Sequence, residues 1–242
     1  MAIVDRQVQL AAAVDQVRGR IAQACAAAGR PPDAVTLVAI TKTYPAADVK
    51  LLAELGVTEV GENKDQEARA KARAVREAGV AVRWHFVGRL QRNKAASVVT
   101  YADVVESVDS LRLVRALDEA ARRHRDRPLD ALVQVSIDGD PARGGAVADG
   151  GDPDRDLWRV ADAVAAADAL RLGGVMAVAP LNWNPDVAFE TLAALAARVA
   201  AGHPEATVLS AGMSGDLEQA IAHGATHVRI GTSLLGMRKT LR

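Results

Sequence analysis

A lysine, Lys42, stands where a short apolar segment of the chain ends. The segment before it, Val35 to Ile40, is rich in β-branched and apolar residues and predicts a strand, and Tyr44 and Pro45 turn the chain after it. An apolar, partly desolvated setting favours the free amine of a lysine, the form that attacks an aldehyde. We therefore expect Lys42 to form a Schiff base with a carbonyl compound. The alternative is a solvated lysine at a loop entrance.

Two turns rich in glycine and hydroxyl residues lie in the last third of the chain. Ser210 to Asp216 follows one predicted strand and opens a helix, and Arg229 to Ser233 follows the last predicted strand. Backbone N–H groups in such turns can approach an anion, and a helix N-terminus favours negative charge. Each turn alone could simply cap a helix. Together with a Schiff-base lysine, the two turns predict a phosphorylated aldehyde as the ligand.

Two further polar residues lie at or within predicted strands. Asn63 follows Gly61 and Glu62 at the end of the second strand, where it either orients a ring substituent of the ligand or caps the following helix. His85 lies inside an apolar strand, where a histidine is usually a hydrogen-bonded core residue. Only Asn63 of these two predicts a ligand contact.

Short apolar or β-branched segments alternate with longer segments of helical periodicity, the pattern of a parallel α/β protein. The predicted strands are Val35–Ile40, Glu59–Val60, Arg83–Val87, Val104–Val105, Ala131–Ile137, Gly174–Val178, Thr207–Leu209 and Val228–Ile230. The predicted helices are Gln7–Ala28, which precedes the first strand, and then Asp48–Leu55, Asp65–Ala78, Leu111–His124, Asp154–Ala167, Val187–Ala201 and Leu217–His223. Eight strands with intervening helices favour a (β/α)8 TIM barrel with an extra N-terminal helix, although a doubly wound open sheet would give similar local patterns.

The organisation of the chain favours one domain over residues 1–242, because no Pro/Ser-rich linker divides it. The single compositional break, Gly139 to Pro153, is rich in glycine and lacks apolar periodicity, which predicts a long mobile loop. In a barrel this loop would lie on the carboxyl face of the strands, where active sites form. It is then either a lid or a surface insertion.

The composition excludes several classes of protein. Thirty basic and thirty acidic residues cancel, so nothing points to binding of nucleic acid or of an anionic membrane. Cys25 is the only cysteine, which rules out an intrachain disulfide and predicts a buried small residue. Asp5 and Arg6 precede any apolar segment, and no segment reaches the roughly 20 apolar residues of a membrane helix. We expect a cytoplasmic protein.

The sequence resembles the YggS/PROSC-type pyridoxal phosphate homeostasis proteins, which share the barrel of the alanine racemase N-terminal domain. Six motifs carry the resemblance in order along the chain. They are Leu37–Lys42, Gly61–Asn63 with Gln66 and Glu67, His85–Lys94, Gly174–Ala177, Gly212–Ser214 with Asp216, and Val228–Thr232.

This resemblance implies that pyridoxal 5'-phosphate attaches to Lys42 as an internal aldimine. It implies that three residues hold the phosphate: Ser214, Gly231 and Thr232. It further implies that Arg229 faces the pyridine nitrogen and that Asn63 and Met213 line the pocket. The family has no established catalytic reaction, so no catalytic residue and no metal are implied. The expected role is balancing vitamin B6, with the cofactor and pyridoxal-phosphate-dependent apo-enzymes as partners of a monomer.

Three other functions compete with this interpretation. An amino-acid racemase or decarboxylase would need a second domain and a second base, yet the chain ends at Arg242, and neither Tyr44 nor Tyr101 lies in a recognisable second-base motif. A cofactor-free aldolase would use the same lysine on a sugar phosphate. An interaction or nucleic-acid-binding module has little support, because the net charge is zero and aromatic residues make up only 3% of the chain.

Overall fold

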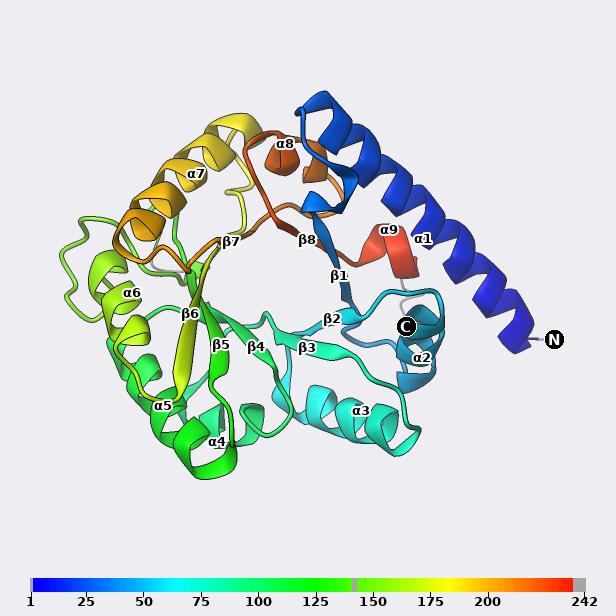
Figure 1. Ribbon diagram of the computed structural model, residues 1–242, viewed down its shortest axis with the longest axis horizontal. Helices are drawn as coiled ribbons and strands as arrows, with labels where there is room; N and C mark the ends of the chain where they lie inside the picture. Colours follow the sequence, from blue (N-terminus) through cyan, green and yellow to red (C-terminus); the bar gives the residue numbers. More distant parts are fainter. Residues whose placement is uncertain (1, 141–142, 237–242) are drawn as a thin grey trace.

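A computed structural model describes residues 2–140 and 143–236 of the chain. Eight parallel strands form a closed barrel in chain order, with β8 hydrogen-bonded to β1 (Figure 1). The strands are β1 (Thr36–Ile40), β2 (Glu59–Glu62), β3 (Arg83–Phe86), β4 (Val104–Val108), β5 (Leu129–Gln134), β6 (Leu170–Met176), β7 (Val208–Ser210) and β8 (His227–Ile230). The closed order confirms the predicted barrel and rules out the open sheet.

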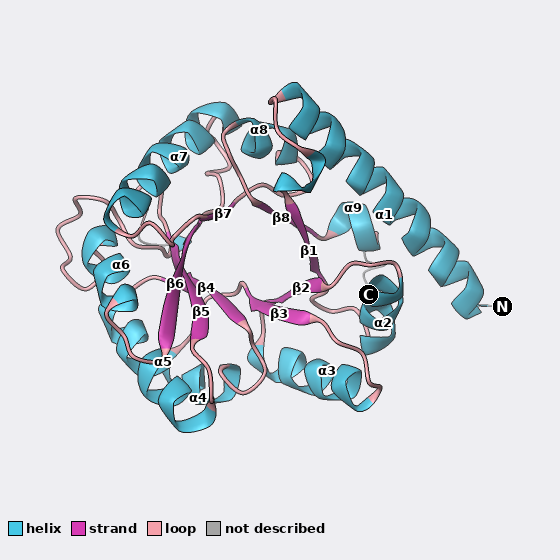
Figure 2. Ribbon diagram, in the orientation of Figure 1, coloured by secondary structure: helices cyan, strands magenta, loops and turns pink. Residues whose placement is uncertain are grey.

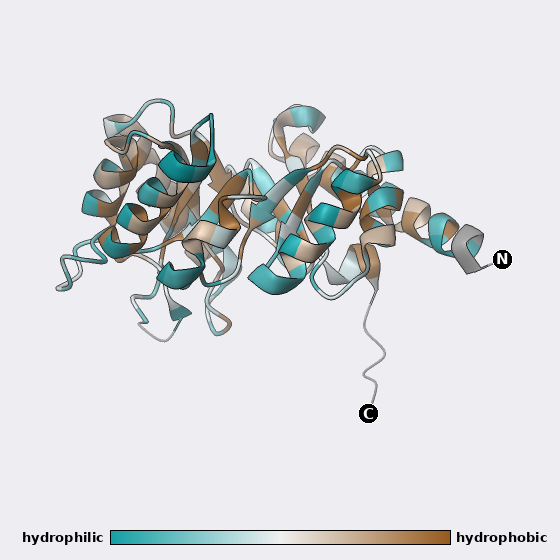
Figure 3. Cartoon of the chain, turned by 90° about the horizontal axis from the view of Figure 1, so that it is seen from below, coloured by the Kyte–Doolittle hydropathy of each residue, from teal (hydrophilic) through white to brown (hydrophobic). Residues whose placement is uncertain are grey.

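Helices surround the barrel (Figure 2). After the first strand they are α2 (Ala46–Glu54), α3 (Asp65–Glu77), α4 (Ala95–Val98), α5 (Leu111–His124), α6 (Leu157–Ala165), α7 (Pro185–Gly202), α8 (Leu217–Ala222) and α9 (Thr232–Leu235). Two short 3-10 turns are η1 (Pro32–Ala34), which precedes β1, and η2 (Arg92–Lys94), which precedes α4. Hydrophilic and hydrophobic residues alternate along these helices, as expected when one face packs on the strands (Figure 3). Among the described residues, no helix combines the length and apolar character required to span a bilayer.

The extra N-terminal helix, α1 (Ala2–Ala27), lies along one side of the barrel next to α8 and α9 (Figure 1). Its buried residues recur every three or four positions: Leu10, Val14, Val17, Ile21 and Cys25. This spacing places them on one face of the helix, which packs against the molecule. The prediction that Cys25 is buried is confirmed.

Most predicted elements lie within a few residues of the observed ones, although α1 begins at Ala2 rather than Gln7 and β6 begins at Leu170 rather than Gly174. Helix α6 begins at Leu157 rather than at Asp154, because the Asp156 carboxylate accepts a hydrogen bond from the Arg159 N–H and caps the helix there. The short helices α4 and α9 are not predicted, since four residues are too few to show a helical period.

The loop predicted over Gly139 to Pro153 is tied to the barrel along part of its length. Ser136 N donates to Ala146 O at 2.8 Å and Ala146 N donates to Gln134 O at 2.7 Å, and Ala146 is fully buried. Gly145 has a φ of +103°, and a Cβ there would lie 2.5 Å from Ser136 N. Only glycine therefore fits this approach to the backbone after β5. Residues 141–142 lie outside the described part of the chain, and the mobility of the loop stays a prediction.

Candidate functional site

The candidate residues follow four neighbouring strands of the barrel. Strand β1 pairs with β8 through Ala39 and Ile230 and with β2 through Ile40 and Gly61. Strand β8 also bonds to the turn after β7, where Arg229 N donates to Gly212 O at 2.9 Å. Six candidates follow the carboxyl ends of these strands: Met213, Ser214, Gly231, Thr232, Lys42 and Asn63. The strand order β7, β8, β1, β2 thus gathers them at one face.

Lys42 lies in a turn whose backbone is held on both sides. Thr41 Oγ1 donates to Glu62 Oε1 at 2.6 Å, and the Thr43 N–H donates to the Glu67 carboxylate. Thr43 has a φ of 73°, a left-handed conformation that few non-glycine residues adopt. The side chain of Lys42 is exposed, so the expected desolvated surrounding is wrong. The turn holds the backbone of Lys42 and leaves its amine open to solvent.

A second lysine, Lys71 on α3, is buried beneath this turn. Its Nζ donates to Glu62 Oε1 at 2.5 Å and to Thr41 O at 2.7 Å, and it lies 3.2 Å from Glu67 Oε1. Burial raises the pKa of Glu62, and the hydrogen bonds from Lys71 and Thr41 oppose that rise. An ammonium has three donors, and these contacts use all of them. Lys71 therefore supports the turn and is not a free nucleophile.

Asn63 offers a polar group without a protein partner. Its Oδ1 is buried and accepts no hydrogen bond from any described residue. Helix α3 begins after Lys64 without a side-chain cap, so the alternative that Asn63 caps this helix is wrong. The backbone of Gly88, in the loop after β3, packs closely against the backbone of Asn63, and a Cβ at Gly88 would lie 2.2 Å from Asn63 O. A buried amide oxygen without a partner is costly, which favours a ligand that donates a hydrogen bond to it.

The two glycine-rich turns contact each other. Ser233 N donates to Ser214 Oγ at 3.3 Å, which brings the turn after β7 to the turn after β8. Met213 N donates to Asp216 Oδ1 at 2.6 Å and closes the first turn on itself. Ser214 is half-buried and Thr232 is exposed. Hydroxyl groups from two separate turns are therefore gathered within one small region.

Helix α1 and the Lys42 loop brace these turns. Arg20 Nη1 donates to Ser214 O at 3.1 Å, and Arg6 Nη2 donates to Leu235 O at 3.2 Å. The Tyr44 hydroxyl donates to Gly236 O at 2.7 Å. The extra helix thus connects the turns after β7 and β8, which lie close to the end of β1.

Arg229 lies inside the barrel and is 5% exposed. Its Nη1 donates to Ser210 Oγ at 2.8 Å and its Nη2 donates to Ala177 O at 2.7 Å. A carboxylate oxygen of Glu106 lies 3.9 Å from Nη1. Arg229 thus lies within ion-pair distance of a buried carboxylate. A guanidinium has five N–H donors, so these contacts leave donors for a ligand.

A buried group of charges continues from Glu106 into the barrel. His85 Nδ1 lies 2.6 Å from Glu106 Oε1, and His85 Nε2 lies 2.6 Å from Glu59 Oε2. Burial alone would favour the neutral ring, but the hydrogen bonds to both carboxylates outweigh it and raise the pKa of His85 to about 9. Burial likewise opposes ionisation of Glu106, yet His85 and Arg229 bring the pKa of Glu106 down to about 2.

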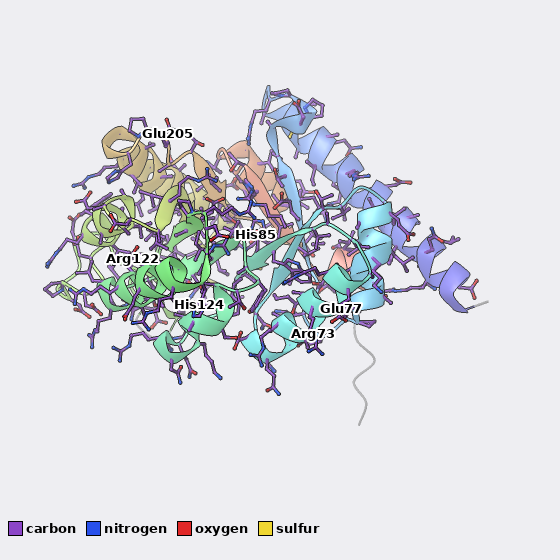
Figure 4. All side chains as sticks on the ribbon, turned by 60° about the horizontal axis from the view of Figure 1, so that its bottom comes forward. Arg73, Glu77, His85, Arg122, His124 and Glu205 are labelled. Atoms are coloured by element: carbon purple, nitrogen blue, oxygen red, sulfur yellow. The ribbon has the colours of Figure 1, made fainter. Side chains whose placement is uncertain are left out.

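Figure 4 places His85 inside the ring of strands, whereas Arg73 and Arg122 lie on the outer helices. The expectation that His85 is a hydrogen-bonded core residue is confirmed. Sequence reasoning missed its partner Glu106, although a carboxylate between Val105 and Ser107 in an apolar strand is itself an unusual signal.

Comparison with known proteins gives a consistent result. Residues 13–239 match the family model described as the alanine racemase N-terminal domain. A pyridoxal phosphate homeostasis protein of Mycobacterium tuberculosis is 46% identical over 248 residues, which cover 97% of this chain and 95% of the relative. The solved structure of Synechococcus elongatus PipY with pyridoxal phosphate bound has a TM-score of 0.79 and 31% identity, covering 94% of this chain and 100% of PipY.

An alanine racemase of Streptomyces coelicolor has a TM-score of 0.72 and 20% identity, and the match covers 96% of this chain but 59% of the racemase. At this identity the likeness shows the fold alone. The mycobacterial relative is stronger evidence of family membership than the racemase, because its identity is high and the match covers nearly all of both chains. The chain therefore belongs to the family of pyridoxal phosphate homeostasis proteins, built on the alanine racemase N-terminal barrel.

Proposed function

We propose that the chain binds pyridoxal 5'-phosphate as a Schiff base on Lys42 and serves vitamin B6 homeostasis rather than turnover of a substrate. One arrangement supports the proposal: the exposed Lys42, the unpartnered Oδ1 of Asn63 and two hydroxyl-bearing turns follow neighbouring strands, and the guanidinium of Arg229 lies inside the barrel with donors left for a ligand. These groups match the aldehyde, the ring substituents, the ring nitrogen and the phosphate of the cofactor. The pyridoxal phosphate bound in PipY supports the assignment.

The phosphate end fits the two turns. Ser214 and Thr232 offer hydroxyl groups from two turns that are already in contact, and a hydroxyl can donate a hydrogen bond to a phosphate oxygen. Gly231 lies against β1, where a Cβ would contact Ile40 at 3.5 Å. In the proposed arrangement these three residues of the two turns hold the phosphate close to the strand that carries Lys42.

The ring end fits Asn63, Met213 and Arg229. The oxygen and nitrogen of an amide can exchange places by rotation, so Asn63 can either accept from or donate to a ring substituent. Met213, which is 38% exposed, would cover one side of the ring. When bound, pyridoxal phosphate supplies an electrophilic carbonyl and an electron-withdrawing ring. Arg229 can only donate, so it favours the unprotonated ring nitrogen, which withdraws electrons weakly. This setting suits storage and release of the cofactor.

The visible absorption spectrum of purified protein incubated with the cofactor tests this function. Wild type should gain a visible band that borohydride removes, and Lys42→Ala should lack it. Lys64→Ala is the matched control, because Lys64 is an exposed lysine in the neighbouring turn, and it should keep the band. Loss of the band in Lys64→Ala together with its retention in Lys42→Ala would contradict the assignment.

The proposed role also predicts how the protein behaves toward substrates and partners. A single-domain, cytoplasmic monomer that stores the cofactor should reactivate a pyridoxal-phosphate-dependent apo-enzyme and should sediment as one chain. Incubation with L-alanine, followed by circular dichroism, should show no sustained racemisation. Turnover at the rate of a dedicated racemase would favour the alternative enzyme function instead.

A further inference from the structure

A continuous chain of polar groups crosses the inside of the barrel below Arg229. Arg229 donates to Ser210 Oγ at 2.8 Å, and Ser210 Oγ donates to Glu106 Oε2 at 2.6 Å. The other carboxylate oxygen of Glu106 lies 2.6 Å from His85, whose second nitrogen lies 2.6 Å from Glu59. The side chains of this polar chain come from five strands: Glu59 from β2, His85 from β3, Glu106 from β4, Ser210 from the end of β7 and Arg229 from β8.

The directions of these hydrogen bonds follow from the chemistry of the groups. A guanidinium can only donate, so Ser210 accepts from Arg229, and its single hydroxyl proton is directed to Glu106. Both nitrogens of His85 face carboxylate oxygens, and both carry a proton only in the imidazolium form. The geometry therefore describes alternating charges: negative on Glu59, positive on His85, negative on Glu106 and positive on Arg229.

The surroundings of His85 are consistent with this pattern. Burial and neighbouring positive charge lower the pKa of His227, whose ring centroid lies 6.3 Å from that of His85, so His227 is the neutral one of the two. Burial opposes ionisation of Glu59, but its hydrogen bond to His85 and the positive charges of His85 and Arg83 lower its pKa. The Glu59 side chain is 20% exposed, whereas Glu106 is fully buried. The chain of charges therefore reaches solvent only at its Glu59 end, away from the candidate site.

We propose that Glu106 and His85 are positioning residues for Arg229: Glu106, held by the imidazolium of His85, orients Ser210 and supplies the countercharge beneath the guanidinium. This inference rests on the proposed function, because its consequence is for the cofactor ring that Arg229 would face. The carboxylate of Glu106 favours protonation of a group bound above Arg229. Removing that charge should disfavour protonation.

The first test uses the protein without cofactor. Nitrogen NMR of 15N-histidine-labelled protein should show His85 with both ring nitrogens protonated at neutral pH, and Glu106→Gln should lower the pH at which His85 loses its proton. A neutral His85 in wild type at pH 7 would overturn the charge chain, whatever the protein binds.

The second test follows the visible band of the cofactor-loaded protein with pH. Glu106→Gln should move the titration midpoint of this band to lower pH by about one to two units, the effect of a unit charge roughly 6–12 Å away at an effective dielectric constant of about 20. The sign holds for Glu106→Gln even if His85 loses its proton, because Glu106 lies nearer to Arg229 than His85 does. Glu59→Gln, which makes the same charge change farther along the chain, should give a smaller shift in the same direction over the pH range in which His85 keeps its proton.

Glu205→Gln provides the control for the second test. Glu205 is an exposed carboxylate before β7, labelled in Figure 4, and its removal should leave the midpoint unchanged. If Glu106→Gln does not fold, the partly exposed Glu59 keeps the test available. An unchanged or upward midpoint would overturn the inference if it were found in folded Glu106→Gln, or in Glu59→Gln whose His85 is still protonated by nitrogen NMR. Absence of any band in wild type would overturn the proposed function and, with it, the effect on the cofactor.

Discussion

The imidazolium of His85 should make the stability of the protein fall as pH rises from neutral to alkaline. Its pKa lies at about 9 in the folded protein against an ordinary value of 6.5. A group whose pKa is raised by folding contributes fully below its unfolded pKa and loses that contribution as pH rises through the folded one. This difference in pKa corresponds to about 3 kcal/mol.

Urea unfolding of wild type and His85→Gln at about pH 6 and pH 9 measures this contribution. The variant should be less stable at pH 6, because one glutamine amide cannot donate to both Glu106 and Glu59 as the imidazolium does. The difference in unfolding free energy between the two proteins should shrink by about 3 kcal/mol at pH 9. Differences that stay equal across this range would refute the imidazolium.

Three further predictions concern the supports of the site. Lys71→Met should lower the free energy of unfolding by about 3–5 kcal/mol, because it leaves the buried carboxylate of Glu62 without its partner. Adding Glu62→Gln should recover part of this loss. An unchanged urea midpoint in Lys71→Met would contradict the ion pair. Gly88→Ala should lower the melting temperature by several degrees, since its Cβ meets Asn63 O, and a wild-type melting curve would contradict this close approach. Arg229→Lys should weaken cofactor binding about tenfold in a spectrophotometric titration, because an ammonium cannot reproduce the planar fork; wild-type affinity would exclude contact with the ring.

Much of the candidate site could be predicted because parallel strands share one polarity. Once Lys42 is placed after the first strand and Thr232 after the last, closure of the barrel brings both to the same face. Asn63 follows in the same way from the pairing of β1 with β2. The predicted strand ends were accurate enough for this purpose, although β4 and β6 are longer than predicted.

The supporting contacts could not be predicted, because they depend on the register between distant segments. Ser210 and Glu106 are 104 residues apart in the chain, and their hydrogen bond exists only when both strands point these side chains into the barrel. In the sequence, Lys71 is one of many charged residues of an amphipathic helix, and nothing distinguishes it from the exposed ones. Its burial beneath Thr41 follows from how α3 packs on the barrel, which no local pattern encodes.

Covalent attachment at Lys42 is the central claim, and mapping the attachment site tests it most directly. Protein loaded with pyridoxal 5'-phosphate is reduced with borohydride, digested and analysed by mass spectrometry. We expect the phosphopyridoxyl group on the peptide that contains Lys42. Its presence instead on Lys64, Lys71 or Lys94, with Lys42 unmodified, would show that Lys42 is not the attachment site.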